Sequence, residues 1–199
     1  MRSLLAALAT TAALAAPAAA EIPVSEISRY LNSFQTAKAD FTQVNSDGSI
    51  STGELSINRP GRARFDYAAP NNGLVIAGGQ QVAIFDPVSN TPPEQYPLSQ
   101  TPLSIILAQT VDMGRSGMLV RHGGDATQTS VTLQDPANPQ YGNIQLVFTP
   151  SPTQLRQWVI TDDTGAQTTV ILGDMQTGVS LGSAPFSIPQ EMRRRGLSN

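Results

Sequence analysis

The sequence predicts a mainly β protein in which one antiparallel sheet is covered on one face by two or three short helices. Apolar and polar side chains alternate between Glu54 and Tyr67, which is the period of two that half-buried strands require. Charged residues make up only 14% of the chain, whereas 16 glycines and 15 prolines supply turns. Two other segments repeat apolar residues at helical spacing. These observations favour a meander of strands with helices packed on one side.

The strand candidates follow one another at short spacing along the chain. Leu74-Val75-Ile76 and Val82-Ala83-Ile84-Phe85 flank Gly78-Gly79, which predicts a hairpin with a glycine turn. The remaining candidates alternate apolar and polar residues or are rich in β-branched and aromatic side chains. They lie at 54–58, 62–67, 118–121, 130–133, 143–148, 157–161 and 168–172.

Two helices are expected from the spacing of apolar side chains. The first spans 24–34, where apolar residues recur at intervals of three and four: Val24, Ile27, Tyr30, Leu31 and Phe34. The second spans 102–110, with Thr101 as its N-cap and Pro102 at its first position. Its face is almost wholly apolar and consists of Leu103, Ile105, Ile106 and Leu107.

A sheet of this many strands curls, and only the helices are available to cover its concave face. One interpretation is that the helices form a lid over an apolar cavity. The other is that a fully packed core lies beneath the helices, since closed cores are the rule and pockets are few per protein. The periodicity is compatible with both.

The first twenty residues have the pattern of a cleavable signal peptide. Arg2 supplies a positive charge, 4–16 is an apolar stretch, and Ala18-Ala19-Ala20 provides the small residues that a signal peptidase requires. The apolar stretch is too short for a transmembrane anchor. We therefore expect a signal peptide at 1–20, a single domain at 21–199, and a processed protein free in the periplasm. The chain contains no cysteine, so neither disulfides nor a lipidated N-terminal cysteine are expected.

The polar residues offer little for nucleic acid, a metal or catalysis. Without Arg2 the chain has eleven basic and fifteen acidic residues, a formal charge of −4, which argues against nucleic acid as a partner. His122 is the one histidine, and we expect it to be a polar residue before a glycine turn. No G-x-S-x-G nucleophile elbow occurs. Asp162-Asp163 precedes Thr164-Gly165, which favours a solvated hairpin turn over a carboxylate site. We expect no enzyme activity, no metal and no cofactor.

Arg193-Arg194-Arg195 form a cluster near the C-terminus. One interpretation is a solvated, frayed tail. The other is a weak contact with anionic lipid headgroups or with an acidic partner.

Three sequence blocks carry a resemblance to a known family. Phe41-Thr42-Gln43 forms the first, the segment from Gly53 to Tyr67 with Arg59-Pro60-Gly61 at its centre forms the second, and Thr101-Pro102 forms the third. Asp86-Pro87 and the turn from Asp162 to Gln167 add to the pattern. Together they resemble the outer-membrane lipoprotein carrier protein family, LolA, over almost the whole chain after the signal peptide.

The resemblance implies a fold, a function and partners. The fold is an incomplete antiparallel β-barrel with a helical lid over a hydrophobic cavity. The function is that of a periplasmic chaperone, a monomer, that carries acylated lipoproteins from the inner to the outer membrane. The implied partners are an inner-membrane ABC-type release complex and an outer-membrane lipoprotein receptor, or the outer membrane itself.

The resemblance also implies site residues. Arg59 is expected to latch the lid through the backbone carbonyls of Leu31 and Ile106. The expected lid and cavity-lining residues are Leu31, Leu103, Ile105, Ile106, Leu107, Phe65, Tyr67 and Trp158. Two alternative functions remain open: a lipid-sensing or lipid-binding module on the same half-barrel, and a lipid esterase, which the missing nucleophile elbow disfavours.

Overall fold

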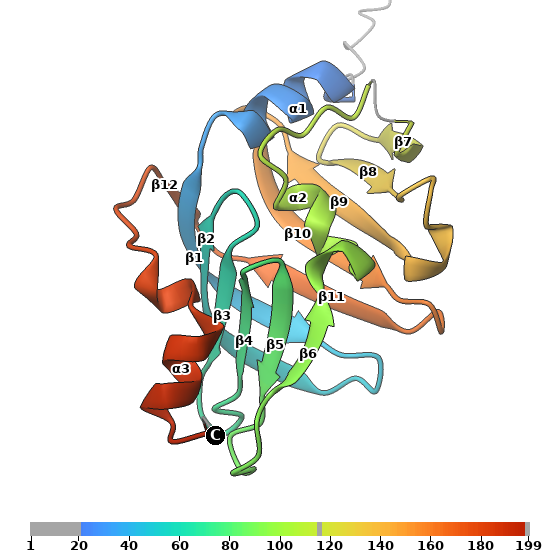
Figure 1. Cartoon of the computed structure of the whole chain (residues 1–199). Coiled ribbons are helices and arrows are strands. Elements are labelled where there is room, and N and C mark those ends of the chain that lie inside the picture. The colour runs from blue at the N-terminus through green and yellow to red at the C-terminus, as the bar shows by residue number, and fades with distance from the viewer. Residues whose placement is uncertain (1–20, 115–116, 198–199) are drawn as a thin grey trace, which may run out of the picture.

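In the computed structural model, which describes residues 21–114 and 117–197, twelve strands form one antiparallel sheet (Figure 1). The signal peptide predicted at 1–20 lies outside the described residues. From one edge to the other the strand order is β6 (Glu94–Pro97), β5 (Gln81–Phe85), β4 (Leu74–Gly78), β3 (Ala63–Tyr67), β2 (Ile50–Asn58), β1 (Thr36–Val44), β11 (Gln167–Leu172), β10 (Gln154–Thr161), β9 (Asn143–Thr149), β8 (Thr129–Leu133) and β7 (Leu119–Gly124). The short strand β12 (Gln176–Thr177) pairs with β1.

The sheet curls without closing, because β6 and β7 stand at opposite ends of its strand order. Helices α1 (Val24–Asn32) and α2 (Leu103–Ile106) lie on its concave side, and α3 (Ile188–Arg194) lies against the outer side (Figure 1). Successive side chains of β4 and β5 point alternately to the concave side and to the outer side of the sheet. Ala77 and Val82 join the core under α1 and α2, whereas Ile76 and Ala83 pack with α3. The predicted incomplete barrel with short helices is therefore confirmed.

The predicted strands are present, with small shifts at their ends. Gly78 pairs with Gln81, so the hairpin turns at Gly79-Gln80 rather than at Gly78-Gly79. Both turn residues have positive φ, 58° and 64°, as the tight turn of a two-residue hairpin requires. The strand candidates did not include β1, β6 or β12. The side chains of β6 and β12 are mostly exposed and show no alternation of burial.

The second helix is much shorter than the predicted 102–110. It is one turn, preceded by a 3-10 turn at Leu98–Gln100, and Thr101 does not cap it, because its hydroxyl donates to the Leu98 carbonyl. A longer helix would bond the Val111 amide to the Leu107 carbonyl. Instead, Leu107 accepts from the Gly61 amide and the Val111 amide donates to the Asn32 side chain. Tertiary hydrogen bonds therefore end this helix.

Helix α3 shows that the frayed-tail interpretation of the arginine cluster is wrong. Ser187 caps the helix by accepting from the Gln190 amide. Ile188, Met192 and Leu197 pack against apolar side chains on the outer side of β4 and β5. The C-terminal segment is thus held on the sheet as a second, smaller apolar cluster.

Glu191 is buried at the base of α3 and binds three arginines. Its carboxylate accepts hydrogen bonds from Arg194 and Arg195, and Arg64 of β3 approaches it at 3.5 Å. Burial alone would raise the pKa of Glu191, but the bonds from Arg194 and Arg195 and the charge of Arg64 lower it to about 2. The carboxylate is therefore ionised at neutral pH.

Glu191→Gln should lower the free energy of unfolding by about 2 kcal/mol at neutral pH, because the arginines lose their counter-charge. In the wild type this stabilisation is present above the ordinary carboxyl pKa and is lost as the pH falls from 4.5 toward 2. Urea unfolding across this pH range measures both effects. The control is Glu54→Gln, which removes an exposed pair with Lys38 and should change stability by less than about 1 kcal/mol. Equal losses for the two variants would contradict the prediction.

Candidate functional site

The concave face of the sheet is covered by a lid, which we define as α1, α2 and residues 107–114. Ile27 and Leu31 of α1 and Leu103 and Ile106 of α2 are buried against the sheet. Asn32 joins the two parts of the lid, since its side chain donates to the Val111 carbonyl at 2.8 Å and accepts from the Val111 amide at 2.9 Å. This pair of bonds makes the lid one connected unit.

The turn between β2 and β3, residues 58–62, touches both parts of the lid, and we call it the latch loop. Arg59 Nη2 donates to the backbone carbonyls of Leu31 and Phe34, where α1 ends. The Gly61 amide donates to the Leu107 carbonyl at 2.8 Å, where α2 ends. Gly61 has a φ of +69°, a conformation that glycine adopts without strain. The latch loop therefore ties each helix to the sheet by a different group.

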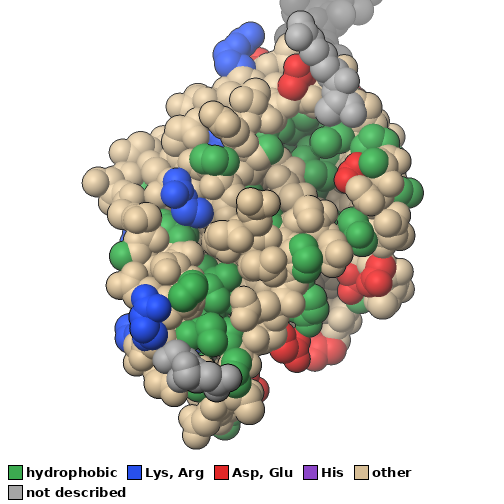
Figure 2. Space-filling view, viewed as in Figure 1, with side chains coloured by type: hydrophobic (Ala, Val, Ile, Leu, Met, Phe, Trp, Pro, Cys, Tyr) green, Lys and Arg blue, Asp and Glu red, His purple; other side chains and the backbone are tan. Residues whose placement is uncertain are grey.

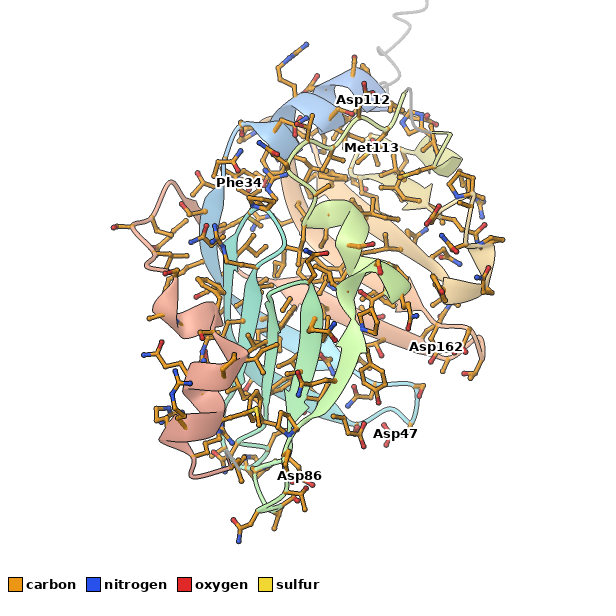
Figure 3. The ribbon with its side chains drawn as sticks, viewed as in Figure 1. Phe34, Asp47, Asp86, Asp112, Met113 and Asp162 are labelled. Atoms are coloured by element: carbon orange, nitrogen blue, oxygen red, sulfur yellow. The ribbon has the colours of Figure 1, made fainter. Side chains whose placement is uncertain are left out.

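The prediction that Arg59 bonds to the Ile106 carbonyl is wrong. Phe34 supplies the second acceptor instead, and its ring also lies under the guanidinium, with 5.0 Å between Arg59 Cζ and the ring centroid. Figure 3 shows Phe34 where the chain passes from α1 into β1. In the latch loop, Gly61 and not Arg59 makes the hydrogen bond to the end of α2. The guanidinium thus binds only the end of α1.

Arg59 is a buried cation with an incomplete set of partners. Its side chain is 3% exposed, and its Nε and Nη1 make no hydrogen bond within the described part of the chain. Burial lowers the pKa of the guanidinium from its ordinary value. Burying these two unpaired donors costs free energy, which offsets part of the stabilisation from the two carbonyl bonds. The lid is therefore held on the sheet by a buried cation that lacks hydrogen bonds at two of its nitrogens.

Aromatic side chains form a continuous series along the concave face. Trp158 meets Phe65 at a ring-centroid distance of 6.3 Å, Phe65 meets Phe41 at 5.6 Å, and Phe41 meets Tyr67 at 5.2 Å, all edge to face. Trp158 is fully buried beneath the lid, whereas Tyr67 is half-buried and bonds Gln43 through its hydroxyl. The structure thus brings together three of the predicted site residues, Phe65, Tyr67 and Trp158.

Open space lies beside α2 rather than directly under it. One pocket of about 310 Å³ is lined by the lid and the β7–β8 region. Its apolar side chains include Ile105, Val111, Met113 and Leu133, and Asp112 and Asp135 also border it. Figure 2 shows hydrophobic side chains gathered in this recess, and Figure 3 places Asp112 and Met113 on the segment beside α1.

A second groove of about 490 Å³ lies on the other side of α2, where Leu103 faces Val82, Tyr96 and Ile160. Leu31, Ile106, Leu107, Phe65 and Trp158 are instead buried in the core between the lid and the sheet. The closed lid is therefore packed on the concave face, and the apolar space continues as a groove on each side of α2.

The other polar residues singled out in the sequence have structural roles. His122 lies inside β7, not before a turn, and its Nε2 is 3.0 Å from the Ile22 carbonyl. Asp162 does form a turn: its carboxylate accepts from Thr164 and Ala166, and the Thr164 bonds lower the pKa of Asp162. Among the residues the structure describes, no group of three or more His, Cys, Asp or Glu side chains is placed to hold a metal ion.

Sequence reasoning missed Asn32, Phe34 and Gly61 as residues whose hydrogen bonds hold the lid. Asn32 is the last residue of a helix. Asparagine is common at helix ends, so its presence there does not indicate a backbone partner far away in the sequence. Gly61 acts through its backbone amide, which no side-chain pattern reveals. The one usable signal was the Arg59-Pro60-Gly61 run, which marks a tight connection between two strands.

Comparison with known proteins adds independent findings. The family model "Outer membrane lipoprotein carrier protein LolA" matches residues 32–189. An outer-membrane lipoprotein carrier protein of Pseudomonas paraeruginosa is 26% identical over 173 residues, covering 82% of each chain. One from Chromohalobacter salexigens is 26% identical over 201 residues, covering 94% of this chain and 93% of the relative.

A solved LolA superfamily protein from Nitrosomonas europaea superposes with a TM-score of 0.46 and 11% identity, covering 83% of this chain and 98% of the other. No helix within the described residues is long and apolar enough to cross a membrane. The family model spans the end of α1, the latch loop, α2 and strands from β1 to β12. This chain belongs to the outer membrane lipoprotein carrier protein family, LolA.

Proposed function

We propose that the protein is a periplasmic chaperone that shields the acyl chains of lipoproteins while carrying them from the inner to the outer membrane. Family membership over residues 32–189 carries the proposal, and the relatives in Pseudomonas paraeruginosa and Chromohalobacter salexigens are named as lipoprotein carriers. Each methylene removed from water gains about 0.8 kcal/mol, so an acyl chain needs an apolar site to cross an aqueous compartment.

The lid supplies such a site when it moves away from the sheet. The side chains that it buries, among them Leu31, Leu103 and Ile106, cover apolar surface on the concave face. Acyl chains that enter beside α2 take the place of these side chains against the sheet. The grooves on either side of α2 are the points of entry, since they already expose apolar side chains of both the lid and the strands.

The latch loop sets the balance between the closed and open lid. Opening breaks the bonds of Arg59 to Leu31 and Phe34 and the bond of Gly61 to Leu107. In exchange the guanidinium regains water at Nε and Nη1, which lack partners when the lid is closed. A cargo molecule shifts this balance only through its higher affinity for the open form.

Export and handover complete the proposal. Cleavage of the signal peptide after Ala20 releases a monomeric carrier that begins at Glu21. The Ile22 amide donates to the buried Thr129 hydroxyl at 2.9 Å, which anchors this new terminus on β8. An ABC-type release complex loads lipoproteins at the inner membrane, and an outer-membrane receptor, or that membrane itself, accepts them.

Depletion of the protein should leave lipoproteins in the inner membrane, because no other shield then carries their acyl chains through the periplasm. Separation of the two membranes after depletion, followed by lipoprotein detection in each, measures the distribution. Re-expression of the wild-type chain is the control. Unchanged outer-membrane lipoproteins after depletion would exclude the carrier function and favour a lipid-sensing module.

Arg59→Leu should load lipoprotein but release it about 10- to 100-fold more slowly. Hydrogen bonds to a charged group contribute about 1.5 to 3 kcal/mol, and their loss destabilises the closed, empty form relative to the loaded form. Arg59→Lys should be intermediate, since an ammonium keeps the charge without the planar fork. A transfer assay at equal loading compares the variants.

The matched control for this assay is Arg62→Leu. Among the described residues, the Arg62 guanidinium bonds only to Asn58 of the same loop, so its removal leaves the lid contacts in place. Release at the wild-type rate by Arg59→Leu, or equal slowing by both variants, would rule out the latch mechanism.

Trp158 should report cargo, because it is the only tryptophan in the chain and is buried beneath the lid against Phe65. In the empty protein we expect blue-shifted emission that iodide does not quench. Loading with an acylated lipopeptide should change its intensity or wavelength, whereas the deacylated peptide should not. Emission that stays the same when saturable binding is shown by another method would contradict its placement next to the cargo.

A further inference from the structure

The positive charge of the protein is concentrated on the outer side of α3. Arg64, Arg193, Arg194 and Arg195, which we call the basic patch, are accompanied by two acidic side chains, Asp66 and Glu191. The rest of the chain from residue 21 onward has seven basic and thirteen acidic residues. Figure 2 shows Lys and Arg side chains over α3 at the lower left, and Asp and Glu side chains at the lower right. The molecule is thus electrically asymmetric despite its net negative charge.

The two acidic residues hold the patch in place without neutralising it. Glu191 is buried and ionised, so it fixes the positions of Arg194 and Arg195. Asp66 binds Arg64 through two hydrogen bonds of 2.7 Å. The Arg194 side chain remains 65% exposed. Arg193 is exposed, and its side chain makes no hydrogen bond or ion pair with another described residue. Two guanidinium groups therefore face solvent on a helix that is anchored to the sheet.

The surroundings of the patch fit a broad anionic surface better than a single acidic group. The groove that runs along α3 is lined by residues such as Gln81, Ser187 and Gln190, and no charged side chain takes part in it. The arginines therefore stand on a protruding helix and not inside a pocket. Planar guanidinium groups bind phosphate oxygens with two parallel hydrogen bonds, and each charge near an anionic membrane adds to the attraction.

We propose that the basic patch docks the protein onto the anionic phospholipid headgroups of a membrane, with Arg193 and Arg194 as the contacting residues. The docking face is on the convex side of the sheet, whereas the lid is on the concave side (Figure 1). A docked molecule therefore leaves its lid free to move. The proposal concerns the empty protein and does not depend on the identity of the cargo.

Vesicle flotation with cargo-free protein, purified from the periplasm of an expression host, tests the proposal. Vesicles of phosphatidylcholine mixed equally with phosphatidylglycerol should bind the wild type, and pure phosphatidylcholine should not. Arg193→Gln combined with Arg194→Gln should lower the partition coefficient on anionic vesicles by about 30-fold, since two charges are lost. The Arg193 side chain has no partner among the described residues. Although Arg194→Gln removes the ion pair of Arg194 with Glu191, Arg64 and Arg195 still pair with that carboxylate, so this variant should keep its fold.

The matched control combines Arg29→Gln with Arg121→Gln, which removes the same charge from exposed positions on α1 and β7. It should bind anionic vesicles as the wild type does.

Wild-type binding should also fall when ionic strength rises, because screening shortens the reach of the charges. Inorganic phosphate should compete no better than chloride at equal ionic strength. Absent binding to anionic vesicles, equal losses for the two variants, or selective competition by phosphate would each overturn the proposal, the first in favour of an acidic protein partner.

Discussion

The structure depends on one constraint: an antiparallel sheet with an apolar concave face that does not close on itself. A closed barrel would cover this face with its own strands, but β6 and β7 end the strand order without pairing to each other. The exposed apolar surface must then be covered by other segments. The chain uses two short helices for this purpose, one before the first strand and one between β6 and β7. Because they belong to connections and not to the sheet, they can leave without breaking a strand pair.

The polar contacts that hold the lid are made to its backbone groups, mostly at the ends of its helices. Arg59 binds carbonyls where α1 ends, Gly61 binds the carbonyl where α2 ends, and Asn32 binds both backbone groups of Val111. Carbonyls at helix ends lack partners within the helix and readily accept water instead. Water can therefore replace each of these contacts as the partner of the carbonyl. The buried apolar side chains supply most of the free energy that keeps the lid closed, and the polar contacts set its position.

The sequence predicted those features that depend on local spacing. Helix α1 follows from apolar residues at three- and four-residue intervals, and the central strands follow from alternation such as Ala63, Phe65 and Tyr67. The length of α2 could not be predicted, because partners more than forty residues away in sequence, Gly61 and Asn32, take the groups that would extend it. Arg59 was found only through the family motif, and its second acceptor was misassigned because Gly61 makes the contact with α2. Helix α3 escaped notice because it is seven residues long and carries only two large apolar side chains, Ile188 and Met192, too few to establish a helical period.

Arginine has opposite roles on the two sides of the sheet, and the difference lies in its partners. Around Glu191, three arginines share a buried carboxylate, so separating them leaves an uncompensated charge in the interior. Arg59 has only carbonyl acceptors and a ring beneath it, and two of its nitrogens lack hydrogen bonds. Moving Arg59 into water relieves its desolvation and breaks only two bonds to carbonyls, whereas moving Glu191 away would break its ion pairs with three arginines. Helix α3 is thus held on the sheet by opposite charges, whereas the lid, which opens in the proposed function, is held by a cation without an anion.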